Sequence, residues 1–291
     1  MAKNDVYLNG RIVPAEQAVV SVSDAGFLHG ASCFTTMLAH NGVVFRFDSH
    51  LKRLMETVRL FSLRTDATGP LLKEATYKLL AHNDLKEARV RITLTPGSMS
   101  LVPAGKEQPQ HQPTTLITAS PLGDHPKELS EKGISVVVSS FRQAKGDPTF
   151  GYKTGCYFLR VLARQEAAAK GADEALWYTQ DNYLAESCFC NVFLVLKGKV
   201  FTPPRDTPVL PGVIRSVVME LCRKLKVECD DRTALTVREM LAAEEVFLTS
   251  SVMGIRPVVR IEGHSVGDER PGKVTRIIMS AYRKLLDEEC P

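Results

Sequence analysis

The chain has 291 residues, 44% of them hydrophobic, which is enough for one large or two medium folded domains. Its 37 Lys and Arg exceed its 33 Asp and Glu by four, and no basic run is dense enough to indicate a nucleic-acid partner. No apolar segment is long enough for a membrane span, and the first ten residues lack the apolar stretch of a signal peptide. We therefore expect a cytoplasmic protein without a nucleic-acid or membrane partner.

The cysteines give no sign of a disulfide framework. There are seven, an odd number, and none forms a CxxC pair. Free thiols in a reducing compartment are the favoured interpretation, and we expect no metal site. Cys188 and Cys190 would point to one face of a strand, so a metal or disulfide role for this pair stays the minor alternative.

Residues 1–119 predict a small α+β domain. The Asn9-Gly10 pair is typical of a tight turn between two short strands, and Asp48 or Ser49 can cap a helix. Proline, glycine and polar residues between Pro96 and Pro113 indicate an exposed loop. Strands are expected at residues 6–8, 11–13, 33–39, 43–47, 88–95 and 114–119, and helices at residues 50–61 and 69–81.

Residues 120–127 (SPLGDHPK) hold two prolines and a glycine and predict a linker to a larger domain over residues 128–291. Gly171 is placed to end the first long helix of that domain, and Pro271 to begin the last. Residues 250–256 are expected to form a loop. Strands are expected at residues 134–139, 174–179, 183–186, 191–196, 200–202, 246–249 and 257–261, and helices at residues 154–170, 213–225, 237–243 and 271–288.

Two residues of this second half are candidates for cofactor chemistry. Lys153 lies among aromatic residues, and apolar neighbours favour the neutral amine that attacks an aldehyde. Glu186 stands at the end of a predicted strand, where a buried carboxylate would keep a pyridine nitrogen protonated. The alternatives are ordinary: most lysines are solvated, and Glu186 would otherwise be an edge-strand charge.

A phosphate-bearing cofactor also needs anion ligands, and three weak signals supply them. Gly212 directly precedes a predicted helix whose first amides, at Val213 and Ile214, would be unpaired donors at the positive end of the helix dipole. Ser250 and Ser251 add hydroxyl groups, and Arg53 can add a full charge. Each signal alone is common in proteins without such a function.

Together these residues resemble the class IV, fold-type IV family of pyridoxal 5′-phosphate (PLP) enzymes. That family contains branched-chain aminotransferases, D-amino-acid aminotransferases, (R)-amine transaminases and aminodeoxychorismate lyase. The resemblance runs from Tyr7 to Val258. Its most specific motifs are His50-Leu51-Lys52-Arg53-Leu54, Tyr152-Lys153-Thr154, Ala185-Glu186-Ser187 with Asn191-Val192-Phe193, Leu210-Pro211-Gly212-Val213-Ile214-Arg215 and Thr249-Ser250-Ser251.

The resemblance implies a two-domain α+β / α/β fold like that of D-amino-acid aminotransferase, with a small α+β domain and a larger strand-rich domain flanked by helices. It implies that Lys153 is the Schiff-base lysine and proton shuttle and that Glu186 pairs with the ring nitrogen. It also implies a homodimer, to which the apolar Phe27-Leu28 could contribute. The other implied cofactor ligands are Arg53, Tyr157, Val213, Ile214, Ser250 and Ser251, and the implied substrate residues are His29, Phe34, Thr36, Val252 and Arg256.

The departures from the family pattern concern the substrate. Ile214 stands where many aminotransferases have a threonine. Thr95-Pro96-Gly97 lacks the arginine of the Thr-Arg-Gly motif that D-amino-acid aminotransferases carry, which counts against that activity. Residues 33–36 and 251–255 resemble aminodeoxychorismate lyases more than branched-chain enzymes.

The resulting hypothesis is a PLP-dependent aminotransferase that moves an amino group between a small amino acid or amine and a 2-keto acid. Two alternatives remain open. The first is aminodeoxychorismate lyase, which expels pyruvate and leaves 4-aminobenzoate. The second is a PLP-binding homologue with weak catalysis that acts as a scaffold, against which the intact Lys153 and Glu186 argue.

Overall fold

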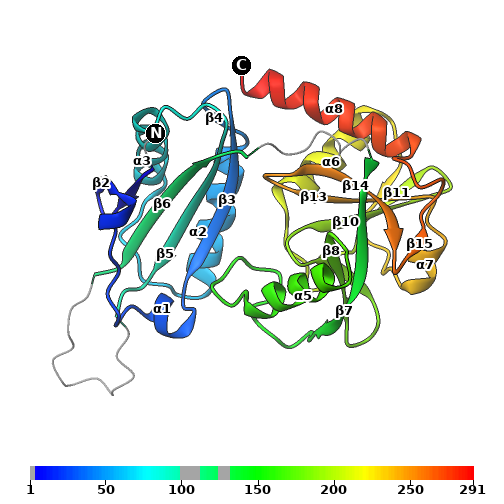
Figure 1. Cartoon of the computed structure of the whole chain (residues 1–291), viewed down its shortest axis with the longest axis horizontal. Coiled ribbons are helices and arrows are strands. Elements are labelled where there is room, and N and C mark those ends of the chain that lie inside the picture. The colour runs from blue at the N-terminus through cyan, green and yellow to red at the C-terminus, as the bar shows by residue number, and fades with distance from the viewer. Residues whose placement is uncertain (1–3, 99–111, 124–131) are drawn as a thin grey trace. The chain divides into compact units, whose positions relative to one another are not determined.

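The computed structural model describes residues 4–98, 112–123 and 132–291 (Figure 1). Their contacts divide into two compact units. Unit 1 comprises residues 1–123, 153–156 and 287–291, and unit 2 comprises residues 124–152 and 157–286. This division differs from the predicted domain bounds in two places, because Lys153–Cys156 and Asp287–Pro291 belong to unit 1.

Unit 1 is an antiparallel sheet with two long helices. Its strands are β1 (Asp5–Leu8), β2 (Arg11–Pro14), β3 (Cys33–His40), β4 (Val43–Val44), β5 (Ala88–Thr95) and β6 (Thr114–Pro121), in the order β2-β1-β6-β5-β3-β4. A short 3-10 turn, η1 (Ala15–Gln17), follows β2. The helices are α1 (Ala25–His29), α2 (Phe47–Leu60) and α3 (Gly69–His82).

Apolar periodicity explains how these helices pack. Leu54 and Val58 of α2, and Leu72 and Leu79 of α3, are buried one turn or two apart. They share a hydrophobic core with alternate residues of β5, such as Ile92. Helix α2 contacts β3, and α3 contacts β1 and β6. The sheet of unit 1 thus has one face covered by helices, and its other face is free to present polar side chains.

Unit 2 contains a mixed sheet of nine described strands, in the order β12-β11-β10-β13-β14-β7-β8-β9, with β15 paired to β14. The pairs β11–β12, β7–β14 and β7–β8 are parallel, and the others are antiparallel. The strands are β7 (Ile134–Gln143), β8 (Glu174–Thr179), β9 (Leu184–Ser187), β10 (Asn191–Leu196), β11 (Lys199–Phe201), β12 (Cys229–Asp230), β13 (Glu245–Ser250), β14 (Gly254–Ile261) and β15 (His264–Ser265).

Four described helices flank this sheet: α5 (Phe158–Ala169), α6 (Val213–Lys224), α7 (Val237–Leu241) and α8 (Lys273–Glu289). Helix α5 packs on β7 and β8, where Ala163 and Ala167 lie against Trp177. Helix α6 contacts β13 and β12. Central strands such as β10 are buried along nearly their whole length, as expected for a sheet covered on both faces.

The predicted helix over residues 154–170 begins too early. Helix α5 starts at Phe158, because the residues before it pair with unit 1 instead. Thr154 forms a bridge with Cys33, and the amide of Gly155 donates to the carbonyl of Ser32 at 2.9 Å. A Cβ at position 155 would collide with the carbonyl oxygen of Gly30, so this close approach requires glycine.

Two other predicted segments also differ. The strand over residues 43–47 ends at Val44, because Arg46 adopts the left-handed conformation (φ 53°) and α2 begins at Phe47. The predicted loop over residues 250–256 is shorter, because β13 extends through Ser250 and β14 begins at Gly254. Among the described helices, none combines the length and apolar character of a membrane span.

Candidate functional site

Lys153 is held by its backbone beside the first residues of β3. The amide of Phe34 donates to the carbonyl of Lys153 at 2.9 Å. The side chain is half-buried, and its Nζ lies 5.1 Å from the centroid of the Phe34 ring. This geometry places an amine against an aromatic face at a position that the backbone fixes.

A second cation of unit 1 lies behind the same strand. Arg53, on α2, donates from Nη2 to Oγ1 of Thr35 at 3.3 Å, and Thr35 is 3.1 Å from Nδ1 of His50. Burial, followed by the positive charges of Arg53 and Lys153, lowers the pKa of His50 well below its usual 6.5. His50 is therefore neutral, and the net charge of this cluster is positive, as an anion site requires.

Strand β5, next to β3, carries an arginine that the sequence analysis did not single out. The Arg91 guanidinium carbon lies 3.7 Å from the centroid of the Phe34 ring, and its Nε donates to Thr93 at 3.1 Å. Arg91 is also the register partner of Thr36. The sequence contains a pattern that indicates this position. Arg91 and Thr93 alternate with the apolar residues that predict β5, so they belong to the opposite face of the strand from the core. His29 is exposed at the end of α1.

In unit 2, Glu186 is only 3% exposed, and donors surround its carboxylate. Its Oε1 accepts from Arg160 Nη2 at 2.5 Å and from Gln143 Nε2 at 3.4 Å. Its Oε2 accepts from the backbone amide of Leu210 at 3.0 Å. Donors on both oxygens fix the orientation of the carboxylate.

Arg160 is the second residue that the sequence analysis missed, because in α5 it reads as an ordinary surface charge. It is 6% exposed, and its Nη1 donates to the carbonyls of Ser187 at 3.1 Å and Cys188 at 3.0 Å. Its guanidinium lies 5.2 Å from the centroid of the Tyr157 ring. Burial acts to lower the pKa of Arg160, but the charges of Glu186 and Tyr157 outweigh it and raise this pKa.

The first turn of α6 has no side-chain cap, so its leading amides at Val213 and Ile214 are suited to an anion. The turn before it is fixed by Asn191, whose Nδ2 donates to the carbonyl of Leu210 at 2.9 Å. A Cβ at Gly212 would collide with the same Asn191 side chain. Leu210, which precedes α6 by three residues, is thus bonded to two side chains. Its carbonyl accepts from Asn191, and its amide donates to Glu186.

The serine pair follows a strand next to Asn191. On β13, Thr249 is the register partner of Asn191, and Ser250 ends the strand. The buried Oγ1 of Thr249 has no hydrogen-bond partner among the described residues. Ser250 accepts from the amide of Met253 at 3.3 Å, within the short turn that contains Ser251 and Val252.

The interpretation of Arg256 as a loop residue is wrong. It lies on β14 as the register partner of Leu248, and its side chain is 4% exposed. Burial lowers the pKa of its guanidinium.

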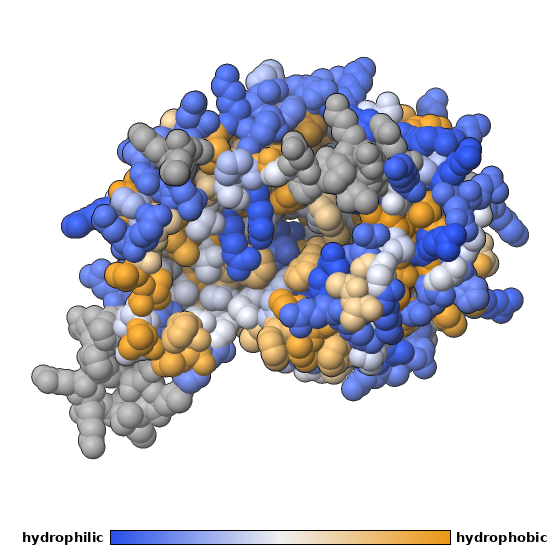
Figure 2. Space-filling model, viewed as in Figure 1, coloured by the Kyte–Doolittle hydropathy of each residue, from blue (hydrophilic) through white to orange (hydrophobic). Residues whose placement is uncertain are grey.

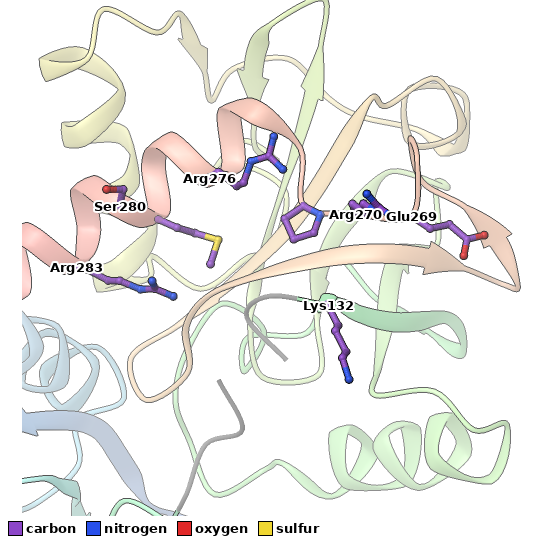
Figure 3. Close-up of a pocket in the computed structure, with 8 residues that line it drawn as sticks. Lys132, Glu269, Arg270, Arg276, Ser280 and Arg283 are labelled. Carbon is purple, nitrogen blue, oxygen red and sulfur yellow. The ribbon is translucent and has the colours of Figure 1, made fainter. Parts of the chain in front are cut away.

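Unit 2 also has a cavity of about 570 Å³ that none of the predicted site residues line (Figure 3). Arg276, Ser280 and Arg283 project into this region from α8, with Arg270 and Lys132 nearby (Figure 3). These five side chains are exposed, so the cavity offers a basic surface without a buried polar group that would orient a ligand.

Comparison with known proteins gives the class. Residues 32–261 match the model of the amino-transferase class IV family. The branched-chain-amino-acid aminotransferase of Escherichia coli (strain K12) is 30% identical over an alignment of 294 positions that covers 98% of this chain and 93% of that protein. The chain belongs to the class IV aminotransferase family and is a PLP-dependent enzyme.

Solved structures agree with this assignment. The branched-chain aminotransferase from the thermophilic archaeon Thermoproteus uzoniensis, solved with norvaline, has a TM-score of 0.86 at 26% identity, covering 98% of this chain and 95% of that one. A 4-amino-4-deoxychorismate lyase structure from Legionella pneumophila has a TM-score of 0.82 at 20% identity, covering 94% of this chain and 97% of that one, and shows the fold alone. The predicted fold type, enzyme class and cofactor are confirmed.

The residues described above fit the cofactor. Glu186 keeps room for a further donor on Oε2, as a ring N–H needs. The uncapped start of α6 and the unpartnered hydroxyl of Thr249 offer donors to a phosphate. Lys153 offers the amine that the cofactor's aldehyde requires.

Proposed function

We propose that this enzyme transfers the amino group of an amino acid with an apolar, branched side chain to a 2-keto acid. The observation that carries the proposal is the buried Glu186 carboxylate, which three donors hold while one acceptor position stays open. The branched-chain aminotransferase from E. coli, 30% identical over nearly the whole chain, supports this substrate class.

The proposed roles follow from the chemistry of each side chain. Lys153 would hold the cofactor's aldehyde carbon through its Nζ until the substrate amine replaces it. The freed Nζ would then take the proton from the substrate's α-carbon and return it on the cofactor side. Glu186 would accept the hydrogen bond of the ring nitrogen. When bound, PLP supplies an electron-withdrawing ring that stabilises negative charge on the α-carbon. The proposed phosphate ligands are Arg53, the amides of Val213 and Ile214, Ser250 and Ser251, and Tyr157 is the proposed partner of the phenolic oxygen.

Substrate recognition is proposed for side chains of both units. In unit 1, Phe34 offers an apolar ring beside Lys153. Thr36 lies two residues further along the same strand and is half-buried. Arg91 adds a guanidinium suited to a carboxylate. In unit 2, Val252 is the proposed apolar contact. Arg256 and His29 have less support as substrate ligands, because the first is buried in a strand and the second is exposed on α1.

The test is a substrate panel on purified protein loaded with PLP. Leucine, isoleucine, valine and alanine are each paired with 2-oxoglutarate, and keto-acid formation is measured. Lys153→Ala should lower turnover by about a hundredfold to ten-thousandfold and abolish the lysine-dependent visible absorbance of bound PLP. Lys52→Ala, an exposed lysine on α2, is the matched control. A visible band that survives Lys153→Ala would refute the assignment of the lysine.

The lyase remains a second candidate, because residues 33–36 and 251–255 resemble lyases. Incubation with aminodeoxychorismate distinguishes the two reactions. Release of 4-aminobenzoate without consumption of a keto acid would replace the aminotransferase proposal with the lyase. Tight PLP binding without turnover of any substrate would instead support the weakly catalytic scaffold.

We also propose that the enzyme is a cytoplasmic homodimer. Phe27 and Leu28 of α1 are 73% and 55% exposed, and hydrophobic side chains gather over this helix (Figure 2). An exposed apolar patch of this kind is typical of a protein–protein interface. The seven cysteines are free thiols, which fits a reducing compartment. Light scattering after size-exclusion chromatography, with Phe27→Ser as the disruptive variant, tests the dimer.

A further inference from the structure

We infer that Arg160 is a positioning residue for the cofactor, which keeps Glu186 oriented so that one oxygen stays open to the ring nitrogen. This inference rests on the proposed function of Glu186. It concerns an arginine to which neither the family motifs nor the fold comparison assigns a role.

Three of the acceptor positions of the Glu186 carboxylate are occupied. A carboxylate has about four lone-pair sites, two on each oxygen. The described donors occupy both sites of Oε1, through Arg160 and Gln143, and one site of Oε2, through the amide of Leu210. The remaining site therefore lies on Oε2. Because Arg160 and Leu210 hold different oxygens, the carboxylate cannot rotate without breaking a bond to one of them.

Arg160 is itself held in place by the backbone. Its Nη1 is tied to the carbonyls of Ser187 and Cys188, so its guanidinium cannot follow a moving carboxylate. It also lies against the ring of Tyr157, the proposed partner of the cofactor's phenolic oxygen. One buried cation thereby fixes two proposed cofactor contacts.

Arg160 also supplies the positive charge that this buried site needs. A carboxylate that is only 3% exposed is costly to bury without a partner, and the Arg160 guanidinium compensates its charge. Without Arg160, the Glu186 carboxylate would lose its charge-assisted donor and with it the fixed orientation toward the ring N–H.

Other titrating groups face this pair. Tyr157 lies against the Arg160 guanidinium, and Cys188, directly after β9, accepts from Arg160 through its carbonyl. Burial raises the pKa of the Cys188 thiol to about 12, so it stays neutral near pH 7. Glu174, buried on β8, has its pKa raised by burial. These groups are present in every variant below, so differences between variants report on Arg160.

The experiment measures the PLP dissociation constant of the apo protein for the wild type and three variants. Arg160→Gln removes the charge, Arg160→Lys keeps it, and Arg164→Gln removes a guanidinium from the same helix as a control. Arg160→Gln should weaken PLP binding about tenfold to a hundredfold, and Arg164→Gln should not. Arg160→Lys should recover part of the affinity, because its ammonium restores the charge but cannot replace the guanidinium's donors.

If Arg160→Gln fails to fold, a variant in which both members of the ion pair are neutral replaces it. The double variant Arg160→Gln/Glu186→Gln leaves no buried charge unpaired, and it should bind PLP as weakly as Glu186→Gln alone. Circular dichroism of each apo protein verifies the fold.

An equal loss of PLP affinity in Arg160→Gln and Arg160→Lys, with no recovery in the lysine variant, would show a merely structural role and overturn the inference. So would additive losses in the double variant. These outcomes leave the lysine-dependent visible band of the wild type intact, whereas failure of the proposed function would remove that band from the wild type itself.

Discussion

The backbone amide of Phe34 donates to the carbonyl of Lys153 at 2.9 Å, so the lysine is held on β3 of unit 1. The chain on either side of Lys153–Cys156 belongs to unit 2, which contains Glu186. The two groups with the most specific proposed roles are therefore built on different units. Each is fixed by its own hydrogen bonds, Lys153 through its backbone and Glu186 through its side chain.

Phe34→Ala should destabilise the protein by about 3–5 kcal/mol, because a buried ring that is 5% exposed would leave a cavity. It would also remove the aromatic surface beside Lys153 and under Arg91. Urea unfolding measures the change. Phe158→Ala is the control, since Phe158 is 71% exposed and its loss should cost under about 0.5 kcal/mol. Equal effects of the two variants would contradict the packing described for Phe34.

Glu186→Gln should reduce the free energy of unfolding of the apo protein by about 3–5 kcal/mol, because it leaves the buried Arg160 charge without its carboxylate. Glu228→Gln serves for comparison, since Glu228 is 73% exposed and its pair with Lys199 should contribute at most about 1 kcal/mol. Chemical denaturation of both variants provides the measurement. A loss at Glu186 no larger than that at Glu228 would show that the pair does not stabilise the fold.

Gly212→Ala should weaken PLP binding by about tenfold, because the added Cβ collides with Asn191 and displaces the turn before α6. Inorganic phosphate should protect the wild type against thermal unfolding more than the variant. Gly146→Ala is the matched control, since nothing lies near the Cβ at that position. Unchanged PLP affinity in Gly212→Ala would remove the start of α6 from the proposed phosphate site.

The pKa of His50 predicts a pH dependence of stability. In the folded protein burial lowers this pKa well below 6.5, so protonation favours the unfolded chain as the pH falls below about 6.5. His50 should therefore contribute full stability above that pH and lose up to about 1.4 kcal/mol per pH unit below it. His50→Gln should remove this component of the slope, and His264→Gln, an exposed histidine, should not. Unfolding curves between pH 7.5 and about 5 provide the comparison.

Much of the fold could be predicted because its elements are specified locally. Local sequence patterns predict several elements correctly. These are the Asn9-Gly10 turn, the apolar repeats of α2 and α3, and the alternation of polar and apolar residues along β5. Errors arose where a distant segment competes with local propensity. Residues 154–157 have a sequence that can continue α5, but Thr154 and Gly155 pair with residues 32 and 33 instead.

The sequence by itself determined the chemistry of this enzyme: the motifs around Lys153 and Glu186 identified the family, and with it the fold type and the cofactor. Only the tertiary structure decided what surrounds those residues. It brings Arg160 into hydrogen-bonding contact with Glu186, stacks Arg91 over the ring of Phe34, and includes Arg256 in a strand. These contacts join residues far apart in the chain or on different elements. No local periodicity encodes them, because they depend on which faces meet when the sheets and helices pack.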